Sequence, residues 1–99
     1  MTHENLVGLK VTDEARYQAY RDAMMPILAR YGGGFRFDLD IARVRQPASG
    51  LEMNRLFVIY FPDRKAQDAF FADSEYKAAR QKYFDPAVSS VTRLAEYDL

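Results

Sequence analysis

The residues best suited to chemistry in this chain are its tyrosines and a few charged side chains in or beside the predicted strands. Several tyrosines fall at helical spacing, so their rings would pack in a core while their hydroxyls reach a surface or a cavity. Pockets lined by aromatic rings and a few polar groups are the usual sites for small molecules. A pocket between a sheet and its helices would draw on six candidates: Tyr20, Arg36, Asp38, Arg55, Tyr60 and Tyr76. The more common alternative is that such tyrosines are plain core residues.

Asp38 is the candidate carboxylate base of this set. Arg36 and Arg55 are its expected neighbours, so we favour a salt bridge over a catalytic role. Asp38 and Asp40 share one face of a predicted strand, but they form a pair without a third ligand, and we expect no metal site. Tyr60 lies among aliphatic neighbours and needs a hydrogen-bond partner if it is buried.

The single histidine, His3, is a weak candidate for a general base or an axial haem ligand. Its place near the start of the chain favours a disordered terminal residue. Gly32-Gly33-Gly34 does not predict a phosphate loop, because it follows a predicted helix and does not lead into one. We therefore expect no cofactor.

The composition favours one globular domain spanning residues 1–99. Fourteen basic and fourteen acidic residues balance, which leaves no overall field for nucleic acid or anionic lipid. Cysteine is absent, so disulfides and thiolate sites are excluded. No apolar stretch approaches the ~20 residues that span a bilayer, and the first residues do not resemble a secretory signal. We expect a cytoplasmic protein without nucleic-acid or membrane partners.

Strands are predicted from short runs of alternating or continuous apolar residues. The last of these strands has a mixed pattern that places Val91, Ala95 and Tyr97 opposite Thr92 and Leu94. The four predicted strands cover residues 5–11, 35–45, 55–61 and 88–97.

Two helical regions are predicted from their caps and apolar stripes. The first begins after the cap Asp13 and ends at the glycines 32–34, with a kink or a break at Pro26. The second begins after Asp63 and bends at Asp73, where a new cap appears. Its second half carries an apolar stripe through Tyr76, Ala79, Arg80 and Tyr83. Residues 46–54, which include Pro47, Ser49 and Gly50, are predicted to form a loop. Asp85-Pro86 is predicted to form a single helical turn.

This order, β-α-β-β-α-β, predicts an α+β, ferredoxin-like antiparallel sheet with both helices on one face. The strand 55–61 is apolar on both faces, with Leu56, Val58 and Tyr60 on one and Phe57, Ile59 and Phe61 on the other. Helices cover only one face, so a second copy is expected to cover the other, and a lone subunit would expose Phe57 and Ile59.

The strand 35–45 alternates cleanly. Strict alternation places Phe35, Phe37 and Leu39 on one face, and Arg36 and Asp38 on the other. Gly8, in the first strand, either weakens that strand or leaves room for a bulky neighbour.

Two groups of residues resemble a known family. The first is Val11-Thr12-Asp13, Tyr17, Tyr20 and Tyr31-Gly32-Gly33; the second is Phe61-Pro62-Asp63, Ala66, Phe70-Phe71 and Ser74-Glu75-Tyr76. Over nearly the whole chain the sequence resembles the uncharacterised family called domain of unknown function thirteen-thirty (DUF1330), a branch of the dimeric α+β barrel superfamily. The resemblance implies a homodimer whose two sheets pair through their open faces into a barrel. It implies no catalytic residue, because the matching motifs are structural.

Two functions follow as hypotheses. The first is a homodimeric protein that binds a small apolar or aromatic molecule between sheet and helices. The second, suggested by the cofactor-free monooxygenases and isomerases of the wider superfamily, is a cofactor-independent enzyme for an aromatic or enolisable substrate. Fold analogy alone supports the second, so the first is preferred.

Overall fold

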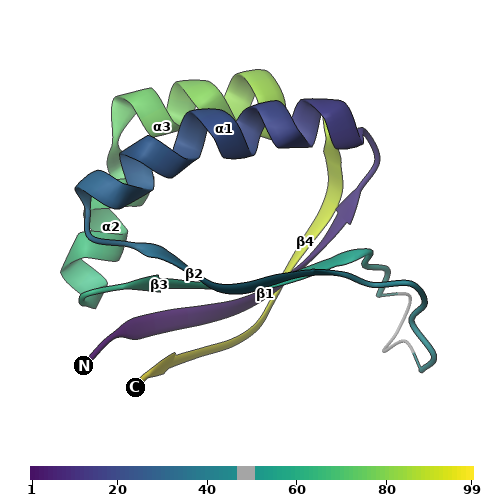
Figure 1. Cartoon of the computed structure of the whole chain (residues 1–99), viewed down its shortest axis with the longest axis horizontal. Coiled ribbons are helices and arrows are strands. Elements are labelled where there is room, and N and C mark those ends of the chain that lie inside the picture. The colour runs from purple at the N-terminus through teal and green to yellow at the C-terminus, as the bar shows by residue number, and fades with distance from the viewer. Residues whose placement is uncertain (47–50) are drawn as a thin grey trace.

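The computed structural model describes residues 1–46 and 51–99, and the chain forms one antiparallel sheet with its helices packed on one face (Figure 1). The strand order is β2-β3-β1-β4, with every neighbouring pair antiparallel. The elements are β1 (His3–Val11), α1 (Glu14–Arg30), β2 (Gly34–Asp40), β3 (Arg55–Phe61), α2 (Arg64–Ala72), α3 (Ser74–Ala79), the π-helical segment η1 (Arg80–Phe84) and β4 (Val88–Asp98). The predicted ferredoxin-like α+β fold is confirmed. Pro47, Ser49 and Gly50, which suggested a loop, lie outside the described residues.

Aspartate caps set the helix starts where the sequence predicts them. The carboxylates of Asp13, Asp63 and Asp73 accept hydrogen bonds from the backbone N–H groups three residues further along. Asp73 also ends α2, so the predicted bend between the two halves of the second helical region is confirmed. Of the kink or break predicted at Pro26, the break is wrong, because α1 is one helix through that residue. Its buried neighbours Met24 and Ile27 hold the helix against the core, which offsets the lost backbone bond.

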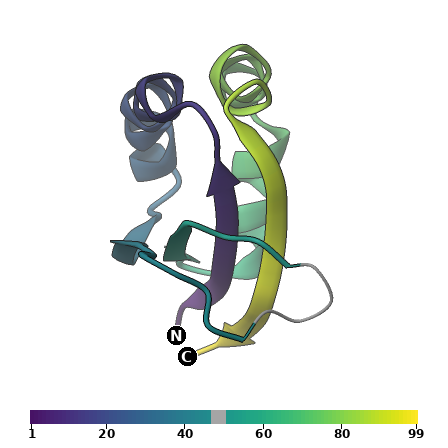
Figure 2. The same ribbon diagram turned by 90° about the vertical axis from the view of Figure 1, so that its right-hand side faces the viewer.

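The helices lie on one face of the sheet, and no helix of the described residues covers the opposite face (Figure 2). On β3, Phe57, Ile59 and Phe61 point to the helices and are 8%, 5% and 0% exposed. The expectation that Phe57 and Ile59 would lie on the open face is therefore wrong. Leu56 and Tyr60 belong to that face.

A β-bulge in β2 breaks the alternation that the sequence suggests. Phe35 pairs with Ile59 but Phe37 pairs with Val58, so one extra residue stands between them. Phe35 therefore shares the helix face with Ile59, whereas Phe37 joins Val58 on the open face. The same shift moves Asp38 to the helix face. The prediction of strict alternation in this strand is wrong, and the strand also ends at Asp40, short of the predicted end.

A second bulge, in β4, changes the faces of its residues. The pairing with β1 shifts between Leu6, opposite Ala95, and Val7, opposite Arg93. As a result Val91 lies on the helix face while Ala95 and Tyr97 lie on the open face. The predicted shared face of these three residues is wrong. Gly8 makes room for a bulky neighbour, since a Cβ there would come within 2.8 Å of the Met53 sulfur.

His3 joins the two ends of the chain and is 5% exposed. Its Nδ1 lies 2.8 Å from Asp98 Oδ1, and its Nε2 lies 2.6 Å from Glu96 Oε2. Gln67 of α2 adds a hydrogen bond to the same Glu96 oxygen, at 3.3 Å. The expectation of a disordered terminal residue is wrong, because β1 begins at His3 and pairs there with the end of β4.

The two carboxylates give this junction a defined pH dependence. Hydrogen bonds to Asp98 and Glu96 raise the pKa of His3, and the bond from His3 lowers the pKa of Glu96. A raised folded-state pKa means that the contribution to stability is complete below about pH 6.5, the ordinary histidine value. The contribution then fades as the pH rises through the higher folded-state pKa.

We expect His3→Gln to lower the thermal midpoint by a few degrees at about pH 5.5, where histidine is protonated and Glu96 is ionised. At about pH 9 the same variant should differ less from the wild-type protein, because the contribution of the protonated imidazole fades as the pH rises through the raised pKa of His3. Thermal unfolding followed by circular dichroism at both pH values measures the difference. A loss that is the same at both pH values would mean that the charge of His3 adds nothing to stability.

Candidate functional site

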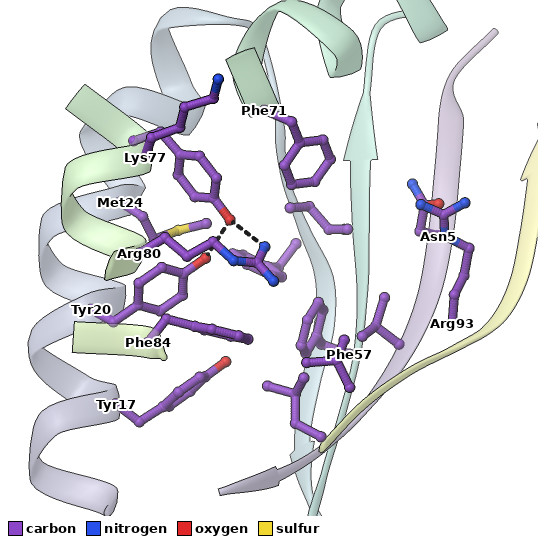
Figure 3. Close-up of a pocket in the computed structure, with 16 residues that line it drawn as sticks. Asn5, Tyr17, Tyr20, Met24, Phe57, Phe71, Lys77, Arg80, Phe84 and Arg93 are labelled. Carbon is purple, nitrogen blue, oxygen red and sulfur yellow. Dashed lines mark hydrogen bonds between the residues drawn. The ribbon is translucent and has the colours of Figure 1, made fainter. Parts of the chain in front are cut away.

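A cavity of about 630 Å³ lies between the helices and the sheet (Figure 3). Its walls are mainly aromatic and aliphatic. The lining residues are Asn5, Val7, Leu9, Tyr17, Tyr20, Met24, Phe35, Phe57, Ile59, Phe71, Tyr76, Lys77, Arg80, Phe84, Val91 and Arg93. Voids in well-packed cores seldom exceed the size of a water molecule. This cavity is instead in the range of small-molecule sites, about 300–1,000 Å³.

Aromatic rings from α1, α3 and η1 build the helical wall. The Tyr20 and Phe84 ring centroids are 4.9 Å apart, and Tyr17 lies 5.7 Å from Tyr20. Tyr20 and Tyr76 join their hydroxyls in a 3.0 Å hydrogen bond. Burial, and then the neighbouring Tyr76, raises the pKa of Tyr20 well above its ordinary value. The Tyr20 hydroxyl is therefore protonated and neutral at physiological pH.

Arg80 brings a positive charge to this wall. Its Nη1 donates a hydrogen bond to the Tyr76 hydroxyl at 3.3 Å, and its guanidinium lies 4.6 Å from the centre of the Phe84 ring. Figure 3 shows the guanidinium pointing from the helix into the space in front of the sheet. Two further cations, Lys77 and Arg93, line the same cavity.

The six residues predicted to share a pocket lie in three different places. Tyr20 and Tyr76 line the cavity, as described above. The other four do not: Arg36 and Tyr60 lie on the open face, and Asp38 and Arg55 lie on the helix face beside α1, in a separate cluster. The physical reason is the bulge in β2, which puts Arg36 and Asp38 on opposite faces of the sheet.

Asp38 is held by two arginines. It accepts hydrogen bonds from Arg55 Nε at 2.8 Å and from Arg21 Nη1 at 2.7 Å. Burial would raise the pKa of Asp38, but the bond from Arg55 and the charges of Arg21 and Arg55 outweigh it, so the pKa is lowered. This geometry matches the salt bridge favoured from the sequence. A carboxylate so strongly held in its ionised form is a poor proton acceptor.

Arg36 and Tyr60 form a second group, on the open face. The Arg36 guanidinium lies 4.1 Å from the centre of the Tyr60 ring, and its Nη2 donates to Glu4 Oε2 at 2.9 Å. Glu4 is only 2% exposed. Burial tends to raise its pKa, yet hydrogen bonds from Thr2 and Arg36 produce a net lowering. Glu4 is therefore ionised and its charge is balanced by Arg36.

Sequence analysis did not single out Arg80, Lys77 or Arg93 as pocket residues, and it missed Phe84. The predicted stripe through Tyr76 and Arg80 would have extended to Tyr83. In η1 the turn is wider than in an α-helix, and Phe84 is the buried residue. Within residues 1–46 and 51–99, no group of three or more histidine or acidic side chains could hold a metal ion. Over the same residues, no helix is long and apolar enough to cross a membrane.

The fold is shared with several solved structures. The RPA0582 protein of Rhodopseudomonas palustris, of unknown function, matches with a TM-score of 0.81 and 18% identity over 99% of this chain and 82% of that chain. A dimeric ferredoxin-like protein of unknown function from Jannaschia sp. CCS1 matches with a TM-score of 0.61 and 13% identity over 100% of both chains. At these identities the likeness concerns the fold alone.

A third structure has a name that suggests an activity. It is a candidate antibiotic biosynthesis monooxygenase from Nitrosomonas europaea, with a TM-score of 0.59 and 13% identity over 99% of this chain and 89% of that chain. No curated protein matches the sequence. The family model for the domain of unknown function DUF1330 matches residues 6–92, which is most of the chain, and the protein therefore belongs to that family.

Proposed function

We propose that this protein is a homodimer that binds a small apolar or aromatic molecule in the cavity between its sheet and its helices. The observation that carries this proposal is the cavity itself, with its size of about 630 Å³ and its mainly apolar wall. Small-molecule sites have this character, with a few polar groups that orient the ligand. Here the polar groups are the hydroxyls of Tyr20 and Tyr76 and the guanidinium of Arg80.

Val91 offers a way to obstruct the cavity without disturbing the core. It lines the cavity from β4 and is 50% exposed, so a larger side chain can be placed there. We expect Val91→Trp to weaken binding of an aromatic probe such as 2-naphthylacetate at least about tenfold, because the indole would occupy ligand space. Isothermal titration calorimetry measures this loss.

Val91→Ala is the matched control. It removes volume at the same position, so it should bind the probe within about threefold of the wild-type affinity, a loss of one or two methyl contacts. Equal binding by the Trp variant and the wild-type protein would place the ligand outside this cavity.

The homodimer is supported by the apolar side chains on the open face of the sheet. Phe37, Leu39 and Tyr97 are 40%, 49% and 37% exposed there, on β2 and β4. Leu56 and Tyr60 of β3 lie between them, and contiguous apolar patches of this kind usually mark interfaces. Structures with the same fold from Bacteroides fragilis, Jannaschia sp. and Thermobifida fusca are described as dimeric. Face-to-face packing of two such sheets closes with two-fold symmetry.

We expect the wild-type protein to sediment as a dimer at micromolar concentration and Leu39→Glu to sediment as a monomer, because the charge would be desolvated in an apolar interface. Met25→Glu is the matched control, since Met25 is an equally exposed apolar residue, at 42%, on α1 of the opposite layer. That variant should stay dimeric. A monomeric wild-type protein, or a dimer that Leu39→Glu leaves intact, would rule out this interface.

A cofactor-independent enzyme is the second candidate function. The donors from Tyr20, Tyr76 and Arg80 could stabilise a negative oxygen that develops on a bound enol or phenol. Oxygen uptake or product formation with a panel of aromatic and enolisable compounds, abolished by Tyr76→Phe, would favour the enzyme. Binding without turnover across the panel would favour the binding protein. Asp38 and Tyr60 are unsuitable test positions, since they lie outside the cavity.

A further inference from the structure

We propose that the ligand of this cavity is an organic carboxylate, with an apolar or aromatic body against the cavity walls and its carboxylate on Arg80. This inference rests on the proposed binding function and adds the chemical class of the ligand to it. It follows from the charge of the lining, from the unused hydrogen-bonding capacity of Arg80, and from the local helix geometry that places Arg80 there.

The charged residues that line the cavity are all cations. Among its described residues there are three cations, Lys77, Arg80 and Arg93, and no aspartate, glutamate or histidine. The chain as a whole is neutral, with fourteen basic and fourteen acidic residues. The charge of the lining is therefore a local feature. In a site walled by hydrocarbon, such a charge attracts anions and repels cations more strongly than it would in water.

Most N–H donors of the Arg80 side chain have no hydrogen-bond partner among the described residues. Within the described part of the chain, its hydrogen bond is the one to the Tyr76 hydroxyl, and its ion-pair partner Asp85 lies 3.8 Å from Nε, beyond hydrogen-bond distance. A guanidinium presents five N–H donors in a planar fork that matches a carboxylate. The guanidinium carbon lies 4.6 Å from the centre of the Phe84 ring, so the N–H groups directed away from that ring are the ones that can receive a ligand.

The other two cations are less suited to anchor a ligand. Arg93 donates to Glu96 at 2.9 Å, which balances its charge. Lys77 is exposed to solvent. Figure 3 shows the Lys77 side chain directed away from the middle of the cavity, whereas Arg80 points into it. Lys77 therefore adds to the positive field at the rim, the balanced charge of Arg93 adds little, and Arg80 is the anchor.

Arg80 lies at the start of the π-helical turn η1 and Phe84 at its end, and both line the cavity. Residues four apart lie close to one face of a helical turn, and the Arg80 guanidinium lies over the Phe84 ring. Tyr83 is only partly buried against the core. Single π-helical turns occur frequently at functional sites.

The hydroxyls beside Arg80 favour the same ligand. Tyr20 is protonated, because its pKa is raised well above its ordinary value by burial and by Tyr76. It is therefore neutral and brings no negative charge that would compensate Arg80. The two hydroxyls carry two protons, and one of them lies in the hydrogen bond between Tyr20 and Tyr76. The other can be donated to a carboxylate oxygen beside the guanidinium.

The test compares ligands that share one body and differ in charge: 2-naphthylacetate, the neutral 2-naphthylacetamide and the cationic 2-(2-naphthyl)ethylamine. A second series has the decyl body: decanoate, decanamide and decylamine. Calorimetry on the full-length wild-type protein at neutral pH should show the carboxylate binding about ten- to a hundredfold more tightly than the amide of the same body, the gain expected of a charged hydrogen bond. The amine should bind more weakly than the amide.

Arg80→Gln should remove the preference for the carboxylate and leave the affinity for the amide within about threefold, because the apolar walls are unchanged. Lys82→Gln is the matched control. It removes the same charge from the same segment at a residue that does not line the cavity, so the preference should persist. Circular dichroism and the thermal midpoint check that both variants fold.

The outcomes separate the two proposals. Equal affinity for acid and amide in the wild-type protein would overturn the carboxylate inference and leave the binding function standing. A preference that survives Arg80→Gln, or that Lys82→Gln removes equally, would overturn the assignment to Arg80. Failure of every compound of both series to bind at millimolar concentration would overturn the binding function and this inference with it.

Discussion

The structure depends on one constraint, the apolar character of β3 on both of its faces. The strand lies inside the sheet, between β2 and β1, so each face must be covered by another layer. The helices cover Phe57, Ile59 and Phe61, and these three are nearly inaccessible in a single chain. The opposite face holds Leu56 and Tyr60, and no helix of the described residues covers it (Figure 1). Burial of that face is favourable by the hydrophobic effect alone. Assembly with a second copy of the chain would therefore complete the packing of the sheet.

Local signals in the sequence were sufficient for the elements and for their order. Asp13, Asp63 and Asp73 cap helices where their short polar side chains predicted it, because capping involves residues only a few positions apart. The fold class followed from that order. His3 shows the limit of such signals. Its burial depends on Glu96 and Asp98 at the other end of the chain, and nothing near His3 in the sequence indicates those partners.

The site could not be predicted to the same depth, because two irregularities change which side chains share a face. A bulge in β2 shifts the alternation by one, although Arg36 and Phe37 are ordinary strand residues with no glycine to mark it. The π-helical turn does the same in η1, where Phe84 replaces Tyr83 as the buried ring. A periodic pattern assigns each residue to a face from the position of the residue before it. A single inserted residue therefore shifts the assigned faces for the rest of the element. Tyr20 and Tyr76 were placed correctly on the helix layer because each precedes any irregularity of its own helix.

The same bulge decides which arginines Asp38 pairs with. With Phe35 on the helix face, strict alternation would have sent Asp38 to the open face, away from the arginines of the helix layer. The bulge returns Asp38 to the helix face, where it forms ion pairs with Arg21 and Arg55. Tyr17 then separates this ion cluster from the cavity, since its ring lines the cavity while its hydroxyl accepts a bond from Arg21. Asp38 therefore pairs within that cluster, whereas Arg80 lines the cavity with a side chain that is 40% exposed and with Asp85 3.8 Å from its Nε. A guanidinium that keeps N–H donors without a partner can bind an anion such as the carboxylate proposed here.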